Sequence, residues 1–264
     1  VRPALWLKIV VNSTFNPLSA LTRLKVKDIL ADLEQALEQG KALLASPGAK
    51  YCVTPNAEMV YEAMHDPDFA ALLNEAALVL PDGAGAVLGA KILGTPLKPL
   101  KQKVAGVDFA DRLLSILEST GGGLYLLGGK PGIAELAGEK LREKYPGLTI
   151  CGTADGYFQE EAPVVAAVNA AAPAVLFVCL GSPKQERFMR AHQQELNCRL
   201  MIGLGGSLDG FAGKVKRAPK WMIRMNLEWL YRLIKEPSRF VRMLRLPKFV
   251  LACKKQARKN RKER

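Results

Sequence analysis

Short apolar runs alternate along the chain with stretches in which apolar residues recur every three or four positions. The runs predict buried strands at 5–11, 50–54, 77–81, 123–129, 148–152, 174–181 and 199–206. The amphipathic stretches predict helices near 25–39, 56–75, 84–93, 107–119, 131–145, 160–171 and 183–196. Fully apolar strands that alternate with helices are typical of a parallel sheet buried on both faces. We therefore predict an α/β fold, with a mainly parallel sheet covered by helices on both faces.

The alternation stops after Gly213. The remaining residues predict two or three helices, interrupted by Pro237 and Pro247 and followed by a solvated tail. We expect two regions, a core domain at 1–213 and a basic helical appendage at 214–264.

Charge divides the chain at the same point. The formal net charge is +13, yet residues 1–213 hold 20 Lys/Arg against 22 Asp/Glu, while residues 214–264 hold 18 against 3. The appendage also carries bulky apolar side chains: Trp221, Met222, Ile223, Trp229, Leu230, Leu233, Phe240 and Leu244. Cationic charge and apolar bulk together favour a partner that is anionic and apolar, such as a phospholipid leaflet or a lipid-linked phosphate.

Composition excludes several classes of protein. The five cysteines show no C-x-x-C spacing and several lie in apolar runs, which favours buried thiols in a reducing compartment. Two histidines, His65 and His192, are too few for a typical His-ligated zinc site and argue against a His-based triad. No stretch predicts a secretory signal or reaches the ~20 apolar residues that span a bilayer. We expect a protein that lies on a membrane if it meets one.

Polar residues follow two of the predicted strands, and ligands of open α/β sheets bind at the carboxyl ends of strands. Asp82 in LPDGAG is a candidate general base, although its spacing alone favours a helix N-cap. Gly83 and Gly85 beside it would let a ligand approach the backbone closely. Thr54 and Asn56 in VTPNAE could bind sugar hydroxyls or phosphate oxygens, or could end a strand and cap a helix.

Glycine-rich turns follow further strands. Gln185 in GSPKQER could bind a nucleobase or a sugar hydroxyl, and Gly128 and Gly129 in LLGGKPG could offer N–H groups to phosphates. Each of these stretches also fits a tight turn, and none matches the dinucleotide or P-loop fingerprint. HDPDF contains D-x-D, but no apolar strand precedes it and Pro67 lies within it. It predicts a surface turn between helices, and we assign no metal site.

Three arginines of the appendage, Arg232, Arg239 and Arg242, are a candidate cluster. Because Pro237 separates the first from the other two, we expect them to converge from two helices across a turn. Guanidinium groups match the geometry of phosphate oxygens, although a solvated basic face is the alternative. The scarcity of acidic partners in the appendage makes diphosphate binding a competitive alternative to that basic face.

Longer stretches between about residues 50 and 251 carry a resemblance. They are TPNAEMV, LPDGAG, VAGVDF, LYLLGGKPG, KYPGLTICGTADGYF, LFVCLGSPKQE, GLGGSLDGFAGKVKRAPKWM and LEWLYRLIKEPSRFVRMLRLPKF. In this order they resemble the WecG/TagA/CpsF glycosyltransferase family. The resemblance implies a Rossmann-like fold and an inverting, metal-independent enzyme without a cofactor. It implies transfer of N-acetylmannosamine or another hexose from a UDP-sugar to a polyprenyl-diphosphate-linked sugar in cell-surface polysaccharide synthesis, at the cytoplasmic face of the cell membrane.

The resemblance also implies roles for individual residues. Asp82 matches the proposed catalytic base, and the three arginines match appendage residues thought to close the site. The matching stretches also contain six candidate substrate-binding residues: Thr54, Asn56, Gly128, Gly129, Gln185 and Arg217. Two departures are that Ala154 and Asp155 stand where the family commonly has histidines, and that Lys103 stands where it has arginine.

Two other classes of protein compete with this interpretation. A basic tail can bind nucleic acid whatever the fold that carries it, although no reader motif is present and we expect no nucleic-acid partner. A dinucleotide-dependent oxidoreductase would need a glycine fingerprint that the sequence lacks. The sequence leaves a homo-oligomer open.

Overall fold

The computed structural model describes residues 33–93, 104–225, 227–235 and 245–262. Within these residues the centre is one sheet of six parallel strands in the order β2-β1-β6-β5-β3-β4. The strands are β1 (Lys50–Val53), β2 (Leu78–Val79), β3 (Gly123–Gly128), β4 (Thr149–Ala154), β5 (Val175–Cys179) and β6 (Leu200–Gly203). Each coincides with a predicted strand, whereas the strand predicted at 5–11 lies outside the described residues.

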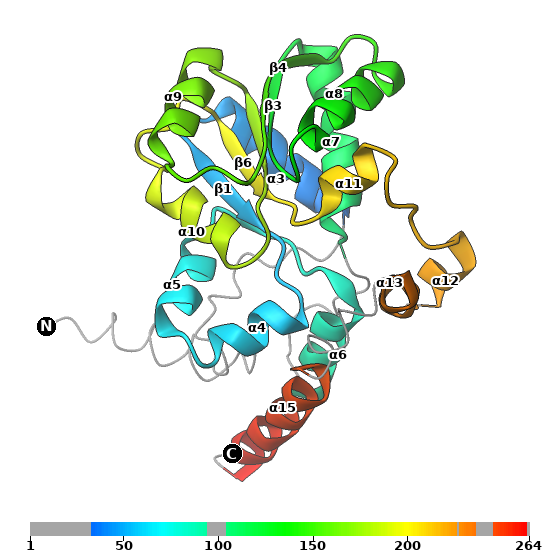
Figure 1. Ribbon diagram of the computed structural model, residues 1–264. Helices are drawn as coiled ribbons and strands as arrows, with labels where there is room; N and C mark the ends of the chain where they lie inside the picture. The colour runs from blue at the N-terminus through cyan, green and yellow to red at the C-terminus, as the bar shows by residue number, and fades with distance from the viewer. Residues whose placement is uncertain (1–32, 94–103, 226, 236–244, 263–264) are drawn as a thin grey trace, which may run out of the picture.

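Helices cover both faces of the sheet (Figure 1). One face carries α3 (Leu33–Ala45), α7 (Gly106–Thr120), α8 (Ile133–Lys144) and α11 (Ser207–Phe211). The other face carries α4 (Ala57–Ala63), α5 (Pro67–Glu75), α9 (Ala162–Ala171) and α10 (Lys184–Ala191). The predicted α/β fold with a parallel sheet is therefore confirmed.

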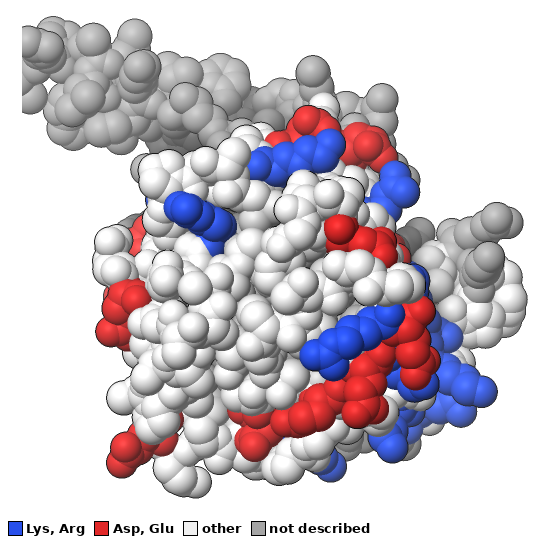
Figure 2. Space-filling model, turned by 90° about the horizontal axis from the view of Figure 1, so that it is seen from above, with Lys and Arg blue, Asp and Glu red and all other residues white. Residues whose placement is uncertain are grey.

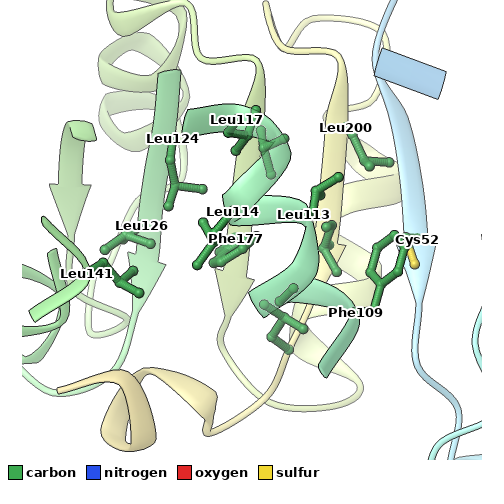
Figure 3. Packing of buried hydrophobic residues seen from close by; sticks show 14 of the residues in the cluster. Cys52, Phe109, Leu113, Leu114, Leu117, Leu124, Leu126, Leu141, Phe177 and Leu200 are labelled. Carbon is green, nitrogen blue, oxygen red and sulfur yellow. The ribbon is translucent and has the colours of Figure 1, made fainter. Parts of the chain in front are cut away.

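Helix α7 shows how the sequence forms the core. Its apolar residues Phe109, Leu113, Leu114 and Leu117 recur at helical spacing, and all four are buried. They point at the sheet, where they meet residues of several strands (Figure 3). A strand such as β5, which is buried over its whole length, needs a helix of this kind on each face.

The HDPDF stretch is confirmed only in part as a turn between two helices, since His65 and Asp66 link α4 to α5 but Pro67 to Phe69 already belong to α5. Asp66 caps α5, because its Oδ1 accepts a hydrogen bond of 2.9 Å from the backbone N–H of Phe69. Pro67 occupies the first helical position, where a missing N–H costs nothing. The predicted helical stretch at 56–75 is thus α4 and α5 in succession.

The appendage contains α12 (Lys220–Arg224), α13 (Glu228–Lys235) and α15 (Arg245–Lys262). The prediction that Pro247 interrupts a helix is wrong, because Pro247 lies in the first turn of α15, where the helix tolerates proline. The expected solvated tail is helical as far as Lys262. Pro237 lies outside the described residues.

The packing of α15 onto two helices of residues 1–213 is a feature that the sequence pattern did not predict. Helix α15 packs against α4 and against α6 (Gly83–Leu93), which follows β2. Figure 1 shows α15 and α6 side by side at the end of the molecule that the carboxyl ends of the strands face. The appendage is therefore attached, through this helix, close to the strand ends where a ligand is expected.

Figure 2 looks down on the opposite end of the molecule, where acidic and basic side chains are interspersed. This mixture agrees with the nearly balanced charge of residues 1–213. Among the helices of the described residues, none is both long enough and apolar enough to cross a membrane.

Candidate active site

The loops after β1, β2, β5 and β6 meet at the carboxyl edge of the sheet. The backbone N–H of Asp82 donates to the carbonyl of Pro55 at 3.1 Å, which joins the loops after β2 and β1. The hydroxyl of Thr54 donates to the carbonyl of Gly203 at 2.9 Å, which joins β1 to β6. The N–H of Gly205 donates to Gln185 Oε1 at 2.8 Å, which joins the loop after β6 to α10, the helix that follows β5. Three predicted site residues thus lie at one edge of the sheet: Asp82 follows β2, Thr54 follows β1, and Gln185 lies in the first turn of α10, the helix after β5.

Several glycines show that this edge borders open space. A Cβ atom built on Gly83, Gly181, Gly205 or Gly206 would meet no atom of the described residues within 4 Å. Gly83 directly follows Asp82 and has φ +82°, a left-handed conformation that glycine adopts without strain. Among the described residues, no atom therefore fills the space beside Gly83, and the approach of a ligand there stays a prediction.

Gly85 has a different role from the expected one. A Cβ at this position would lie 2.8 Å from the Cβ of Ala57 and 3.1 Å from Leu246 Cδ1. The space beside Gly85 is filled by α4 and α15. The prediction that Gly85 lets a ligand approach is wrong, because this glycine allows helices to pack closely.

Asp82 stands between β2 and α6, in the position of an N-cap, and is partly exposed. Since α6 begins at Gly83, the carboxylate follows a buried strand and precedes a helix N-terminus, which favours negative charge. A position between a strand end and a helix start is required both for a general base and for an N-cap, so both roles of Asp82 stay open.

Thr54 is buried and held in place by contacts with two other elements. Its side chain is buried, with 8% exposed. A Cβ on Gly106 would come within 2.7 Å of Thr54 Cγ2, so the start of α7 closes over this residue. Thr54 is held between β6 and α7, with its hydroxyl proton donated to Gly203.

Asn56 is the N-cap of α4. Its side-chain oxygen accepts hydrogen bonds from the backbone N–H groups of Glu58 at 2.9 Å and Met59 at 3.0 Å. The capping alternative is therefore realised, and the residue is exposed at the same edge. Its role in sugar binding stays a prediction.

Gln185 is buried and forms part of a polar chain. Its Nε2 donates to Glu186 Oε1 at 2.6 Å, while its Oε1 accepts from Gly205. Burial raises the pKa of Glu186, against the hydrogen bond from Gln185, which lowers it. Glu186 Oε2 and Ser182 Oγ are both buried and form no hydrogen bond of ordinary geometry within the described part of the chain, although Ser182 lies close enough to lower the pKa of Glu186 as well. Sequence reasoning missed Glu186. Its position next to Gln185, on the side of a helix that also carries Phe188 and Met189, could have indicated a buried carboxylate.

Gly128 and Gly129 lie at the end of β3 and serve the backbone. Gly128 has φ +129°, and a Cβ there would lie 2.3 Å from the carbonyl oxygen of Cys179. The N–H of Gly129 donates to that same carbonyl at 3.4 Å, and its carbonyl accepts from Gly156 at 2.9 Å. Gly128 thus allows β3 and β5 to approach, while a Cβ on Gly129, which has φ +73°, would lie 2.9 Å from Ile133 Cγ2 at the start of α8. Their contact with a phosphate stays a prediction.

Arg217 lies among three carboxylates. Its Nη1 and Nη2 bind the two oxygens of Asp108 at 2.5 and 3.0 Å, and its Nε lies 4.0 Å from Glu228 Oε1. The hydrogen bond with Asp108 raises the pKa of Arg217 against its partial burial, and Glu228 and Asp82 raise it further. Sequence reasoning missed Asp108 and Glu228, of which Asp108 stands in the VAGVDF stretch.

The three appendage arginines are only partly within the described structure. Arg232 belongs to α13, whose first residue is Glu228. Arg239 and Arg242 lie outside the described residues, so their expected convergence stays a prediction. Within the described ranges, no three His, Cys, Asp or Glu side chains gather as a metal site would require.

Comparison with known proteins now gives the family. The description "Glycosyl transferase WecG/TagA/CpsF family" matches residues 19–263. A relative from Bacillus spizizenii is 38% identical over 212 residues, which are 80% of this chain and 81% of the relative. A relative from Staphylococcus aureus strain MRSA252 is 31% identical over 231 residues, 86% of this chain and 89% of the relative. A relative from Bacillus subtilis is 38% identical over 209 residues, which are 79% of this chain and 80% of the relative. All three relatives carry the name N-acetylglucosaminyldiphosphoundecaprenol N-acetyl-beta-D-mannosaminyltransferase. The chain belongs to the WecG/TagA/CpsF glycosyltransferase family and is an enzyme that transfers a hexose.

Proposed function

We propose that this enzyme transfers an N-acetylmannosamine-like hexose from a UDP-sugar to a sugar carried on polyprenyl diphosphate. The relatives' names support the transferred sugar and the lipid-linked acceptor. The transfer proceeds with inversion and without a metal ion, and it serves the synthesis of a cell-surface polysaccharide. Nucleic-acid binding is not proposed, because membership of the family supplies a reaction for the same chain.

Asp82 is the proposed general base. An acceptor hydroxyl is a poor nucleophile until its proton is removed, and a carboxylate within hydrogen-bond reach accelerates this step by about 10²–10⁴-fold. The observation that carries the assignment is the position of Asp82, which is partly exposed at the carboxyl edge and directly precedes Gly83, a residue with space beside it among the described residues. The hydroxyl then attacks the anomeric carbon from the face opposite the departing UDP.

The leaving diphosphate gains negative charge as the bond to the sugar breaks. Arg232, Arg239 and Arg242 are the proposed donors that neutralise this charge, and one such donor is typically worth ~2.7–4 kcal/mol. The pair between Arg217 and Glu228 supports this role for Arg232, because it ties the first turn of α13 to the edge that bears Asp82.

Substrate binding is proposed for six residues of the same edge. They are Thr54, Asn56, Gly128, Gly129, Gln185 and Arg217, of which Gln185 and Arg217 act in part by shaping the loops through their hydrogen bonds.

The appendage is proposed to lie on the inner leaflet of the cell membrane. Trp221, Met225, Trp229 and Ile234 of α12, α13 and the turn between them are exposed large apolar residues on a strongly basic segment. Aromatic and aliphatic side chains on a basic helix suit an anionic lipid surface, where the polyprenyl acceptor also resides.

A panel of UDP-sugars tests the proposal. Each donor is incubated with a short-chain diphosphate-linked N-acetylglucosamine, with and without EDTA, and the product is examined by mass spectrometry and NMR. We expect one N-acetylhexosamine donor to be used, product of inverted anomeric configuration, and equal rates with EDTA. Retained configuration would contradict the single-displacement mechanism, and loss of turnover with EDTA would contradict metal independence.

A further inference from the structure

Helix α15 fits into a notch on α6 that two glycines form. Gly85 and Gly89 are four residues apart and so lie on one side of α6. A Cβ on Gly89 would lie 2.5 Å from Phe249 Cζ and 3.4 Å from Cys253 Sγ, and one on Gly85 would lie 3.1 Å from Leu246 Cδ1. Only glycine at these positions leaves room for α15 at this distance.

At the centre of the contact, two side chains of α15 are buried as completely as the core of the sheet. Phe249 is 1% exposed and Cys253 is 0% exposed. They form a cluster with Ala57 and Val60 of α4, which is separate from the two clusters on the sheet faces. At the rim, Arg245 Nη1 lies 3.4 Å from a carboxylate oxygen of Glu58 and of Glu62 in α4. Helix α15 therefore contacts α4 and α6 at once.

The two helices that α15 joins are the ones that begin at the proposed site. Helix α4 starts directly after its N-cap Asn56 at the end of β1, and α6 starts directly after Asp82. Because the side chains of a helix move with its axis, a displacement of α6 shifts Asp82 relative to the loop after β1. A helix that serves only as a lipid anchor has no need of a buried phenylalanine in a glycine notch.

We infer that Phe249 is a positioning residue, which by seating on Gly89 makes α15 a brace that holds α4 and α6 in register and so fixes Asp82. The inference rests on the proposed role of Asp82. It assigns to the appendage a second contribution, independent of its arginines and of any membrane.

Cys253 provides a probe of the brace. Burial raises the pKa of its thiol to about 11, so in the docked state it reacts slowly with an alkylating reagent. Release of α15 exposes the thiol and accelerates alkylation. Mass spectrometry of the peptide separates Cys253 from Cys151, which is partly exposed from the start.

The test compares Phe249→Ala with Leu251→Ala in the full chain. Leu251 lies on the same helix but is 65% exposed, so it is a matched control. Kinetics use a short-chain, water-soluble acceptor without lipid, which removes any contribution of membrane binding. For Phe249→Ala we expect faster alkylation of Cys253, an unchanged KM for the donor, and a kcat lower by at least about tenfold, since a misplacement of 1 Å can cost a hundredfold. Leu251→Ala should match the wild type in all three.

Three outcomes would overturn the brace. Cys253 could stay protected in Phe249→Ala, it could become exposed with no loss of kcat, or the loss could fall on KM alone.

A second pair of variants covers the case in which Phe249→Ala fails to fold. Gly89→Ala places a methyl group against Phe249, so it should release α15 and lower kcat. Adding Phe249→Leu makes room for that methyl group and should restore both protection and turnover. Failure of the double variant to recover, with circular dichroism unchanged, would also overturn the inference.

The same assays separate the brace from the function on which it rests. Asp82→Asn should lose turnover while Cys253 stays protected. If Asp82→Asn keeps its turnover, the proposed base fails whatever the alkylation of Phe249→Ala shows.

Discussion

Side chains at the carboxyl edge of the sheet and side chains on α12–α13 are held in opposite ways. At the edge, Thr54 and Gln185 are buried and each forms a hydrogen bond to the β6 strand or the loop that follows it. On α12 and α13, Trp221 and Trp229 are 59% and 44% exposed. Both regions belong to one proposed site. The side chains of the first region are held by contacts within the protein, whereas the aromatic side chains of the second are exposed to solvent.

The difference separates two kinds of contribution to catalysis. Groups that are fixed by the fold are preorganised and need no partner to reach their working geometry. Exposed aromatic residues on a basic helix reach their final environment only against another surface. We therefore expect substitutions at the edge to act in any assay, and substitutions on α12–α13 to act most strongly when the substrate is membrane-bound.

The largest effect should come from the edge. Asp82→Asn removes the proposed base and should lower kcat by about 10²–10⁴-fold with both soluble and membrane-bound acceptors. Asp68→Asn, an exposed carboxylate in the first turn of α5, serves as the control and should leave kcat unchanged. If Asp82→Asn lowered kcat only with the membrane-bound acceptor, the edge would not differ from α12–α13 in the way we propose.

The next effect should come from α13. Arg232→Gln removes one proposed donor to the leaving diphosphate, and kcat should fall by about 10²–10³-fold. The control is Arg187→Gln, since Arg187 pairs with Asp66 on the α5 side of the molecule. An unchanged kcat in Arg232→Gln would remove this arginine from the mechanism.

A smaller effect should come from the exposed aromatic residues. Trp221→Ala combined with Trp229→Ala should weaken binding to phosphatidylglycerol vesicles by about tenfold, because partial burial of these rings is worth roughly 1.4 kcal/mol in total. Sedimentation with vesicles measures the binding, and turnover of a soluble short-chain acceptor should stay within about twofold of the wild type. Equal binding of the double variant and the wild type would contradict the proposed lipid contact.

The smallest effect concerns a site away from the edge. Burial lowers the pKa of His192, but its bonds to Glu161 and Glu195 outweigh this and raise it above its usual value. A raised pKa means that the stabilisation is present below the unfolded pKa of about 6.5 and is lost as the pH rises through the folded value. His192→Gln should therefore lower Tm more at pH 6 than at pH 9. The pH-dependent part of the change in the free energy of unfolding should be less than about 1 kcal/mol, because both carboxylates are at least partly exposed. A pH-independent difference in Tm would contradict this.

The elements of the fold could be predicted because local signals are strong. Runs such as 174–181 contain only residues that a doubly covered strand tolerates, and β5 lies within that run. The strand order could not be predicted, since it depends on pairings such as Lys50 with Leu200 that no local pattern encodes. Pro247 was misjudged because proline breaks a helix interior but fits its first turn, and the start of α15 is not marked in the sequence.

The candidate site could be predicted only as a set of positions. The strand-end motifs gave Asp82, Thr54 and Gln185, because parallel strands bring their carboxyl ends to one edge. The partners of Arg217 were missed, since Asp108 lies 109 residues away along the chain and only the fold brings it within 2.5 Å. The notch was missed for a related reason: a glycine that admits a ligand and a glycine that admits a helix look alike in sequence.

The pH dependence of kcat/KM is the most direct test of the central claim that Asp82 removes the acceptor proton. In the wild type, kcat/KM should fall on the acid side as the essential carboxylate becomes protonated. In Asp82→Asn the residual rate should lose that acid limb and become nearly independent of pH there. An unchanged acid limb in Asp82→Asn, together with substantial turnover, would show that another group is the base and would contradict the account.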